Sequence, residues 1–88
     1  MGRKAQPKPR KLASKLQTIR LSFGISQQEM ANRLNALAHT TSTLPGHVSQ
    51  FESGKRLPSF LVLLAYARLA RISTDILIDD RASLLDDW

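Results

Sequence analysis

Apolar residues recur at helical spacing along most of this chain. The first such run places its apolar side chains on one face of an α-helix, at Leu12, Leu16, Ile19 and Phe23. Cations are expected on the remaining surface of that helix, at Lys11, Lys15 and Arg20. Gly24 follows the last apolar position and predicts a left-handed cap that ends the helix.

Capping residues mark the start of a second helix. Ser26 is a favourable N-cap, and Glu29 completes a Ser-x-x-Glu capping box. We expect this helix to run from about Gln27 to Leu34, because Asn35 tolerates the left-handed conformation of a tight exit. Its buried residues are expected to be Met30, Ala31 and Leu34.

Residues 36–42 show no clear period and predict a loop, with an extra turn of the second helix as the alternative. A third helix is expected to begin with Ser42 or Thr43 as its N-cap and Pro45 in its first turn. It should bury Val48 and Phe51, and Gly54 should end it.

Serine caps predict the remaining helices. Ser59 precedes an apolar helix from Phe60 to about Ala70, and Ser73 precedes a short helix with Asp75 near its positive N-terminal end. The short helix carries Ile76, Leu77 and Ile78, and one more turn could involve Leu84, Leu85 and Trp88. No segment has the alternation of a strand, so the sequence predicts an all-α fold of five helices.

The length of 88 residues suits one small domain. We expect a flexible basic arm at residues 1–10, a helical domain at residues 11–79 and an acidic C-terminal tail at residues 80–88. The net charge of +6 favours a polyanionic partner. Cations dominate the start of the chain, whereas aspartates gather near its end, at Asp75, Asp79, Asp80, Asp86 and Asp87.

Composition also argues against several functions. The chain has no cysteine, and His39 and His47 are too few for a structural zinc site, so neither a metal nor another cofactor is predicted. The longest apolar run, Phe60 to Ala67, is far shorter than the ~20 residues of a membrane span. We therefore expect a soluble cytoplasmic protein. No catalytic grouping can be placed on one surface, so an enzyme is not expected.

Several separated motifs occur in a recognisable order. Ser-Gln-Gln-Glu-Met-Ala begins at residue 26, Val-Ser-Gln-Phe-Glu-Ser-Gly-Lys-Arg-Leu-Pro-Ser at residue 48 and Ile-Ser-Thr-Asp-Ile-Leu at residue 72. Between Leu12 and Ile78 the chain resembles the phage-repressor-like helix-turn-helix family of the Xre/Cro type. The resemblance implies a compact, lambda-repressor-like domain that binds double-stranded DNA through its third helix.

The resemblance also implies roles for particular residues. Gln27 looks like the family glutamine that touches a backbone phosphate and braces the third helix, although a plain surface role is the alternative. Gln50 should point outward, where a glutamine can bind adenine through N6 and N7. Glu52 is expected to be structural. The remaining candidate DNA-binding residues are Gln28, Thr43, His47, Ser49, Lys55 and Arg56.

The chain departs from the family pattern in its turn and in its third helix. The predicted turn is longer than the usual ~3–4 residues. Pro45 and Gly46 occupy positions where the family presents base-reading side chains, so specificity should depend on fewer contacts, on loop residues or on DNA shape. Gly46 could equally allow the backbone to approach DNA closely.

The fourth helix is apolar nearly all round, which predicts burial on more than one side. A second copy of the chain could cover the extra surface, formed by Leu61, Val62, Ala65 and Leu69. Cover by the C-terminal tail is the alternative. The basic arm could contact phosphates or the minor groove, or simply keep the chain soluble; its cations are Arg3, Lys4, Lys8 and Arg10.

The sequence therefore predicts a sequence-specific transcriptional regulator, and more specifically a dimeric repressor. An antitoxin that binds both a toxin protein and its own operator is the alternative.

Overall fold

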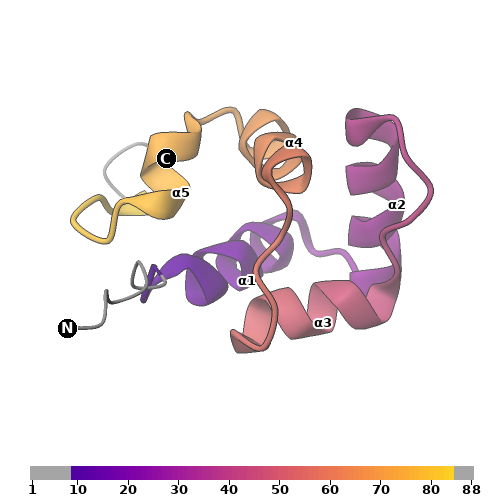
Figure 1. The fold of residues 1–88 in the computed structure, drawn as a ribbon, viewed down its shortest axis with the longest axis horizontal. Helices are drawn as coiled ribbons and strands as arrows, with labels where there is room; N and C mark the ends of the chain where they lie inside the picture. The colour runs from indigo at the N-terminus through magenta and orange to yellow at the C-terminus, as the bar shows by residue number, and fades with distance from the viewer. Residues whose placement is uncertain (1–8, 85–88) are drawn as a thin grey trace, which may run out of the picture.

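The computed structural model describes residues 9–84, which form five helices without a strand (Figure 1). α1 spans Leu12–Phe23, and its buried face includes Leu12, Leu16 and Ile19. Gly24 ends it in the left-handed conformation, with φ of 66°. The cap and most of the apolar face are therefore as predicted.

The structure corrects both predicted faces of α1. Lys15 was expected on the surface, but its side chain is buried because its ammonium donates to the carbonyl oxygens of Ile76 and Asp79 at 2.6 and 2.9 Å. Phe23 was expected in the core, yet it is 41% exposed, and the Arg33 guanidinium lies 5.9 Å from its ring centroid. Contacts with a distant segment therefore decide the burial of Lys15.

α2 spans Gln27–Ala38 and is longer than predicted. Its start is correct, since the Ser26 hydroxyl accepts the backbone N–H of Glu29 at 3.0 Å. Its end at Leu34 and Asn35 is wrong, because the helix continues to Ala38 and His39 takes the left-handed conformation, with φ of 54°. The alternative of an extra turn is therefore confirmed.

α3 spans Pro45–Ser53, with Pro45 as its first residue and Gly54 as its left-handed C-cap. The predicted caps Ser42 and Thr43 are wrong, because Leu44 is the N-cap. The side chain of Asn35 instead holds the segment that precedes the helix. It bonds both the N–H and the carbonyl of Thr43, at 3.0 and 2.9 Å, and so fixes the chain just ahead of the helix.

α4 spans Phe60–Ala70 and α5 spans Thr74–Ile78, with Ser59 and Ser73 as N-caps, as predicted. In Figure 1, α2 stands upright at one end of the molecule and α3 runs along the lower edge. α3 packs against α1 and α2, α4 packs against α2, and α5 packs against α4 and α1. The lower side of α3 faces away from the other described helices (Figure 1). No helix among the described residues has the length and apolar character to cross a bilayer.

The described part of the acidic tail is attached to the domain. The Asp80 carboxylate accepts the backbone N–H groups of Arg10 and Lys11 at 2.9 and 3.0 Å, just ahead of α1. These bonds lower the pKa of Asp80. Leu84 is buried in the core and lines a groove together with residues of α1. Cover of the apolar α4 surface by the tail stays a prediction. Leu85 and Trp88 lie outside the described residues.

Candidate nucleic-acid interface

The outer side of α3 carries a stripe of small and polar residues. Its members are exposed and spaced at i, i+3, i+4 and i+7: Gly46, Ser49, Gln50 and Ser53. The opposite side of the helix is buried through Val48 and Phe51. We call this exposed stripe the outer face of α3.

A sharp change of direction after α3 places cations beside the outer face. Gly54 adopts φ of 81°, and its N–H donates to the carbonyls of Gln50 and Phe51. The N–H groups of Lys55 and Arg56 also donate to the Gln50 carbonyl, at 2.9 and 3.2 Å. Both cations are exposed. A polar helix face flanked by exposed cations suits a phosphate-lined groove.

Gln50 points outward, as predicted, but it is not a free side chain. The Nε of Arg56 donates to the Gln50 Oε1 at 2.9 Å. Arg56 was expected to act as a separate cation, so its pairing with Gln50 was not predicted. The two residues are six positions apart in the sequence. They meet because the chain turns sharply at Gly54, and their spacing alone does not predict that turn.

An ion pair braces the inner side of α3. The Arg20 guanidinium donates from Nε and from the terminal nitrogen to the two oxygens of Glu52, at 2.8 and 3.1 Å. The side chains are 14% and 3% exposed. Arg20 also donates to the Ile25 carbonyl at 2.9 Å. The structural role expected for Glu52 is confirmed, whereas the surface position expected for Arg20 is wrong.

Gln27 joins this brace from the first turn of α2. Its Nε2 donates to the Glu52 Oε1 at 3.3 Å, so the amide ties α2 to α3. The bracing role expected for Gln27 is therefore present in the structure. Its phosphate contact stays a prediction. Gln28 is exposed, and its amide donates to the Asn32 side chain at 3.3 Å.

A buried tyrosine completes the surroundings of the ion pair. Burial, reinforced by the negative charge of Glu52, raises the pKa of Tyr66, so its hydroxyl stays neutral near Glu52 and Arg20. The hydrogen bond from Arg20 to Glu52 in turn raises the pKa of Arg20. The Arg20 guanidinium therefore keeps its positive charge beside Glu52.

Thr43 and His47 have local structural contacts at the start of α3. Thr43 is buried, which turns it away from the surface that a base would approach. The Nδ1 of half-buried His47 accepts the N–H of Leu44 at 3.1 Å, and its ring lies 6.5 Å from that of Phe51. Ser49 is exposed on the outer face. DNA contacts of all these residues stay predictions.

The connection between α2 and α3 spans residues 39–44. It is longer than the ~3–4 residues of a common helix-turn-helix, as the sequence predicted. Asn35 holds its last part, and Thr40 and Ser42 bond each other at 3.0 Å. The turn is thus a structured segment with its own hydrogen bonds.

Residues 16–77 match the profile of the family described as Helix-turn-helix. The chain belongs to the helix-turn-helix family. Among solved structures, the fold resembles the P22 c2 repressor protein, which was crystallised in complex with synthetic operator 9T in the presence of Tl⁺. The TM-score is 0.61 at 20% identity, covering 78% of this chain and 94% of the repressor chain. No match was found among curated proteins.

These comparisons confirm the resemblance to phage repressors and the five-helix fold. The family match supports a DNA-binding transcription regulator. In this helix-turn-helix domain, α2 and α3 are the paired helices, and the outer face of α3 is the surface that the pairing leaves exposed.

The predicted basic arm is only partly described. Arg3, Lys4 and Lys8 lie outside the described residues. Arg10 is exposed, and its backbone is held by Asp80 at the start of α1. Its side chain therefore extends from a fixed position on the helix-turn-helix domain.

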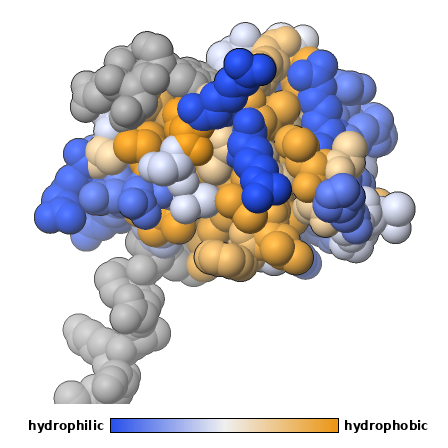
Figure 2. All heavy atoms as spheres, turned by 90° about the horizontal axis from the view of Figure 1, so that it is seen from above, coloured by the Kyte–Doolittle hydropathy of each residue, from blue (hydrophilic) through white to orange (hydrophobic). Residues whose placement is uncertain are grey.

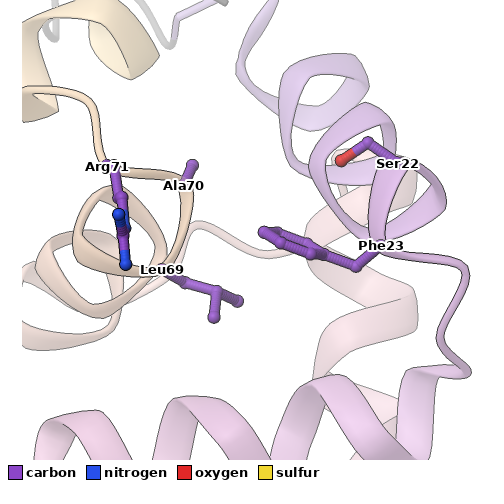
Figure 3. A pocket seen from close by; sticks show the side chains of 5 residues that line it. All are labelled: Ser22, Phe23, Leu69, Ala70 and Arg71. Atoms are coloured by element: carbon purple, nitrogen blue, oxygen red, sulfur yellow. The ribbon is translucent and has the colours of Figure 1, made fainter.

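The predicted partner face on α4 is wrong in part. Val62 and Ala65 are buried in the domain's own core, whereas Leu61 and its neighbour Phe60 are 60% and 76% exposed. Leu69 instead lines a groove of about 540 Å³ between the ends of α1 and α4. There Phe23 and Leu69 point toward one another, beside Arg71 (Figure 3).

The side of the domain away from α3 is partly apolar. Figure 2 views the molecule from above and shows apolar side chains gathered near the middle of this face, crossed by hydrophilic ones. The exposed large apolar residues of the described chain include Leu21, Phe23, Phe60 and Leu61. The described part of the helix-turn-helix domain thus exposes several large apolar side chains.

Proposed function

We propose that this protein is a sequence-specific, double-stranded DNA-binding transcriptional regulator that reads the major groove with α3. The observation that carries the proposal is the outer face of α3, an exposed polar stripe on a helix whose other side is held by the core and by the Arg20–Glu52 pair. A helix fixed from behind can present its side chains to base edges without losing order on binding.

Affinity and specificity would come from different groups. Lys55 and Arg56 lie where the chain leaves α3, and they would bind phosphates with little regard to sequence. Gln50 and Ser49 would read base edges. Gln27 and Gln28 begin α2, whose N-terminus favours a phosphate. Arg10 and the other cations of the arm would add phosphate contacts.

The first turn of α3 limits direct readout. Pro45 and Gly46 offer no side-chain group to a base. Nothing lies within 4 Å of where a Cβ of Gly46 would stand, so its backbone could approach a phosphate or a base edge. The few base contacts imply that DNA shape contributes to selectivity.

We further propose that the protein is a homodimeric repressor on a two-fold-related operator. The P22 c2 repressor, which shares the fold, was crystallised with an operator. Exposed Phe60 and Leu61 supply apolar surface for a second copy. A dimer would bind half-sites about one helical turn, ~34 Å, apart.

Selection of bound sequences from a random DNA pool tests this function. We expect a two-fold-related consensus with its half-sites about 10 base pairs apart, because each α3 would enter one major groove. Reporter expression from a promoter carrying that consensus should fall when the protein is produced. A pool without any enriched sequence would contradict specific DNA binding.

An antitoxin is the second candidate, favoured by the same exposed apolar residues at the start of α4, Phe60 and Leu61. Such a protein would use this surface to bind a small toxin protein while α3 binds its own operator. Purification from the native host discriminates the two. A stoichiometric partner whose toxicity the chain suppresses would support the antitoxin, and a clean homodimer would support the repressor alone.

A further inference from the structure

Gln50 is held by the loop after α3 through both its backbone and its side chain. The N–H groups of Lys55 and Arg56 bond its carbonyl, and the Nε of Arg56 bonds its Oε1 at 2.9 Å. The left-handed Gly54 allows the chain to return over the helix in this way. Gln50 and Arg56 therefore form one unit on the outer face of α3.

The chemistry of this contact fixes the orientation of the Gln50 amide. A guanidinium carries only donors, so it must face the carbonyl oxygen of the amide and not its nitrogen. The Nε2 of Gln50 then lies on the other side of the amide, and it has no hydrogen-bond partner within residues 9–84. Without Arg56 the amide torsion would be broad, since terminal sp³–sp² torsions have weak preferences.

We propose that Arg56 is a positioning residue that holds Gln50 with its Nε2 toward DNA, where it donates to N7 of a purine in the major groove. This inference rests on the proposed function. Both purines present N7 as an acceptor on their major-groove edge. The terminal nitrogens of Arg56 have no partner in the described chain and remain available for a neighbouring phosphate.

Lys55 provides a matched control for this role. It is an exposed cation next in sequence, and its side chain makes no hydrogen bond within the described residues. A cation that only binds phosphate contributes equally to all sequences. A positioning residue contributes in addition to the preference for one base pair.

The experiment first selects the preferred site from a random DNA pool with the full chain. Binding to that site and to its single-base-pair variants is then measured for Arg56→Met, Lys55→Met and Gln50→Ala across a salt series. Both Met variants should lower the salt slope by ~0.9. Only Arg56→Met should also lose about five- to tenfold of preference, at the base pair that Gln50→Ala affects. In the double variant, Arg56→Met combined with Gln50→Ala should reduce the preference at that base pair no further than Gln50→Ala does alone.

One further variant and one modified DNA distinguish the charge of residue 56 and the role of purine N7 from the orientation of the Gln50 amide. Arg56→Lys keeps the charge without the planar guanidinium, so the salt slope should be retained while preference still falls. A 7-deaza purine at the affected base pair should weaken wild-type binding about five- to tenfold and leave Gln50→Ala nearly unchanged. Thermal unfolding midpoints equal to wild type would confirm that these surface variants fold.

Identical preference profiles for Arg56→Met and Lys55→Met would overturn the positioning role, and so would full wild-type affinity for the 7-deaza site. In either case the proposed function would still stand, because a preferred sequence had been found. A pool that returns no preferred sequence would overturn the proposed function and this inference together.

Discussion

Within residues 9–84, α3 has an inner side packed on the rest of the domain and an exposed outer face, where Gln50 is bonded by the loop that follows the helix. On the inner side, Val48 and Phe51 are buried and Glu52 is bonded by both Arg20 and Gln27. On the outer face, the side chain of Gln50 has one partner, Arg56. One helix thus combines a heavily connected side with a sparsely connected one.

This difference separates stability from recognition. Removing a buried contact or one member of a buried charge pair lowers the free energy of unfolding, whereas removing an exposed polar group changes it little. Groups on the outer face remain available because the protein does not need them for its own stability. Substitutions on the inner side should therefore change unfolding, and those on the outer face should change DNA binding alone.

The largest effect is expected from Phe51→Ala. The ring is buried on the inner side, so its loss should lower the free energy of unfolding by about 3–5 kcal/mol through lost burial and the cavity left behind. Chemical denaturation measures this change. Ser49→Ala, on the outer face of the same helix, is the control and should stay within about 0.5 kcal/mol of wild type. Similar losses for both would contradict the two-sided description.

Arg20→Met should have the next largest effect. It leaves the Glu52 carboxylate buried with Gln27 as its remaining partner, which should cost about 2–4 kcal/mol in unfolding free energy. The double variant Arg20→Met with Glu52→Leu removes both charges and should recover most of the loss. A double variant as unstable as the sum of its single changes would show that the ion pair is not the source.

Gln50→Ala should leave unfolding unchanged and alter recognition. Loss of one good base contact should reduce the preference for the selected site by about 1–3 kcal/mol at one base pair. Competition binding with matched and scrambled sites measures this. An equal loss of affinity on both kinds of DNA would mean that Gln50 does not read a base.

The smallest effect is expected from Gln27→Ala. This variant tests whether one side chain both braces the inner side of α3 and contacts DNA. Loss of its bond to Glu52 should lower unfolding free energy by about 0.5–1.5 kcal/mol. A phosphate contact by the same amide would also weaken binding to all DNA sequences alike. Gln28→Ala is the comparison, because its amide bonds only exposed Asn32. Equal unfolding midpoints for wild type and Gln27→Ala would show that its amide does not brace α3.

Local signals predicted most of the helix boundaries. Ser26 and Ser59 cap their helices through side-chain hydrogen bonds within three residues, and Gly24 and Gly54 adopt left-handed caps. Such contacts depend on neighbouring residues, so the sequence is sufficient to predict them. The end of α2 was missed because left-handed His39 carries no comparable signal.

The candidate site was predicted less completely than the fold. The motif around Gln50 and the basic loop could be recognised, since their order and spacing are local. The burial of Thr43 and the pairing of Arg20 with Glu52 could not, because their partners come from other parts of the fold. Similarly, the mixed exposure of α4 could not be read from its uniformly apolar sequence.

By itself, the sequence determined the all-α class, the starts of α2, α4 and α5, the left-handed glycine caps and the family. The tertiary structure alone decided that Lys15 is buried, that Asp80 lies at the start of α1 and that Arg56 holds Gln50. The physical reason is one of range. Helix formation and capping are governed by groups a few residues apart, whereas burial and the pairing of charges depend on which distant segments the folded chain brings together.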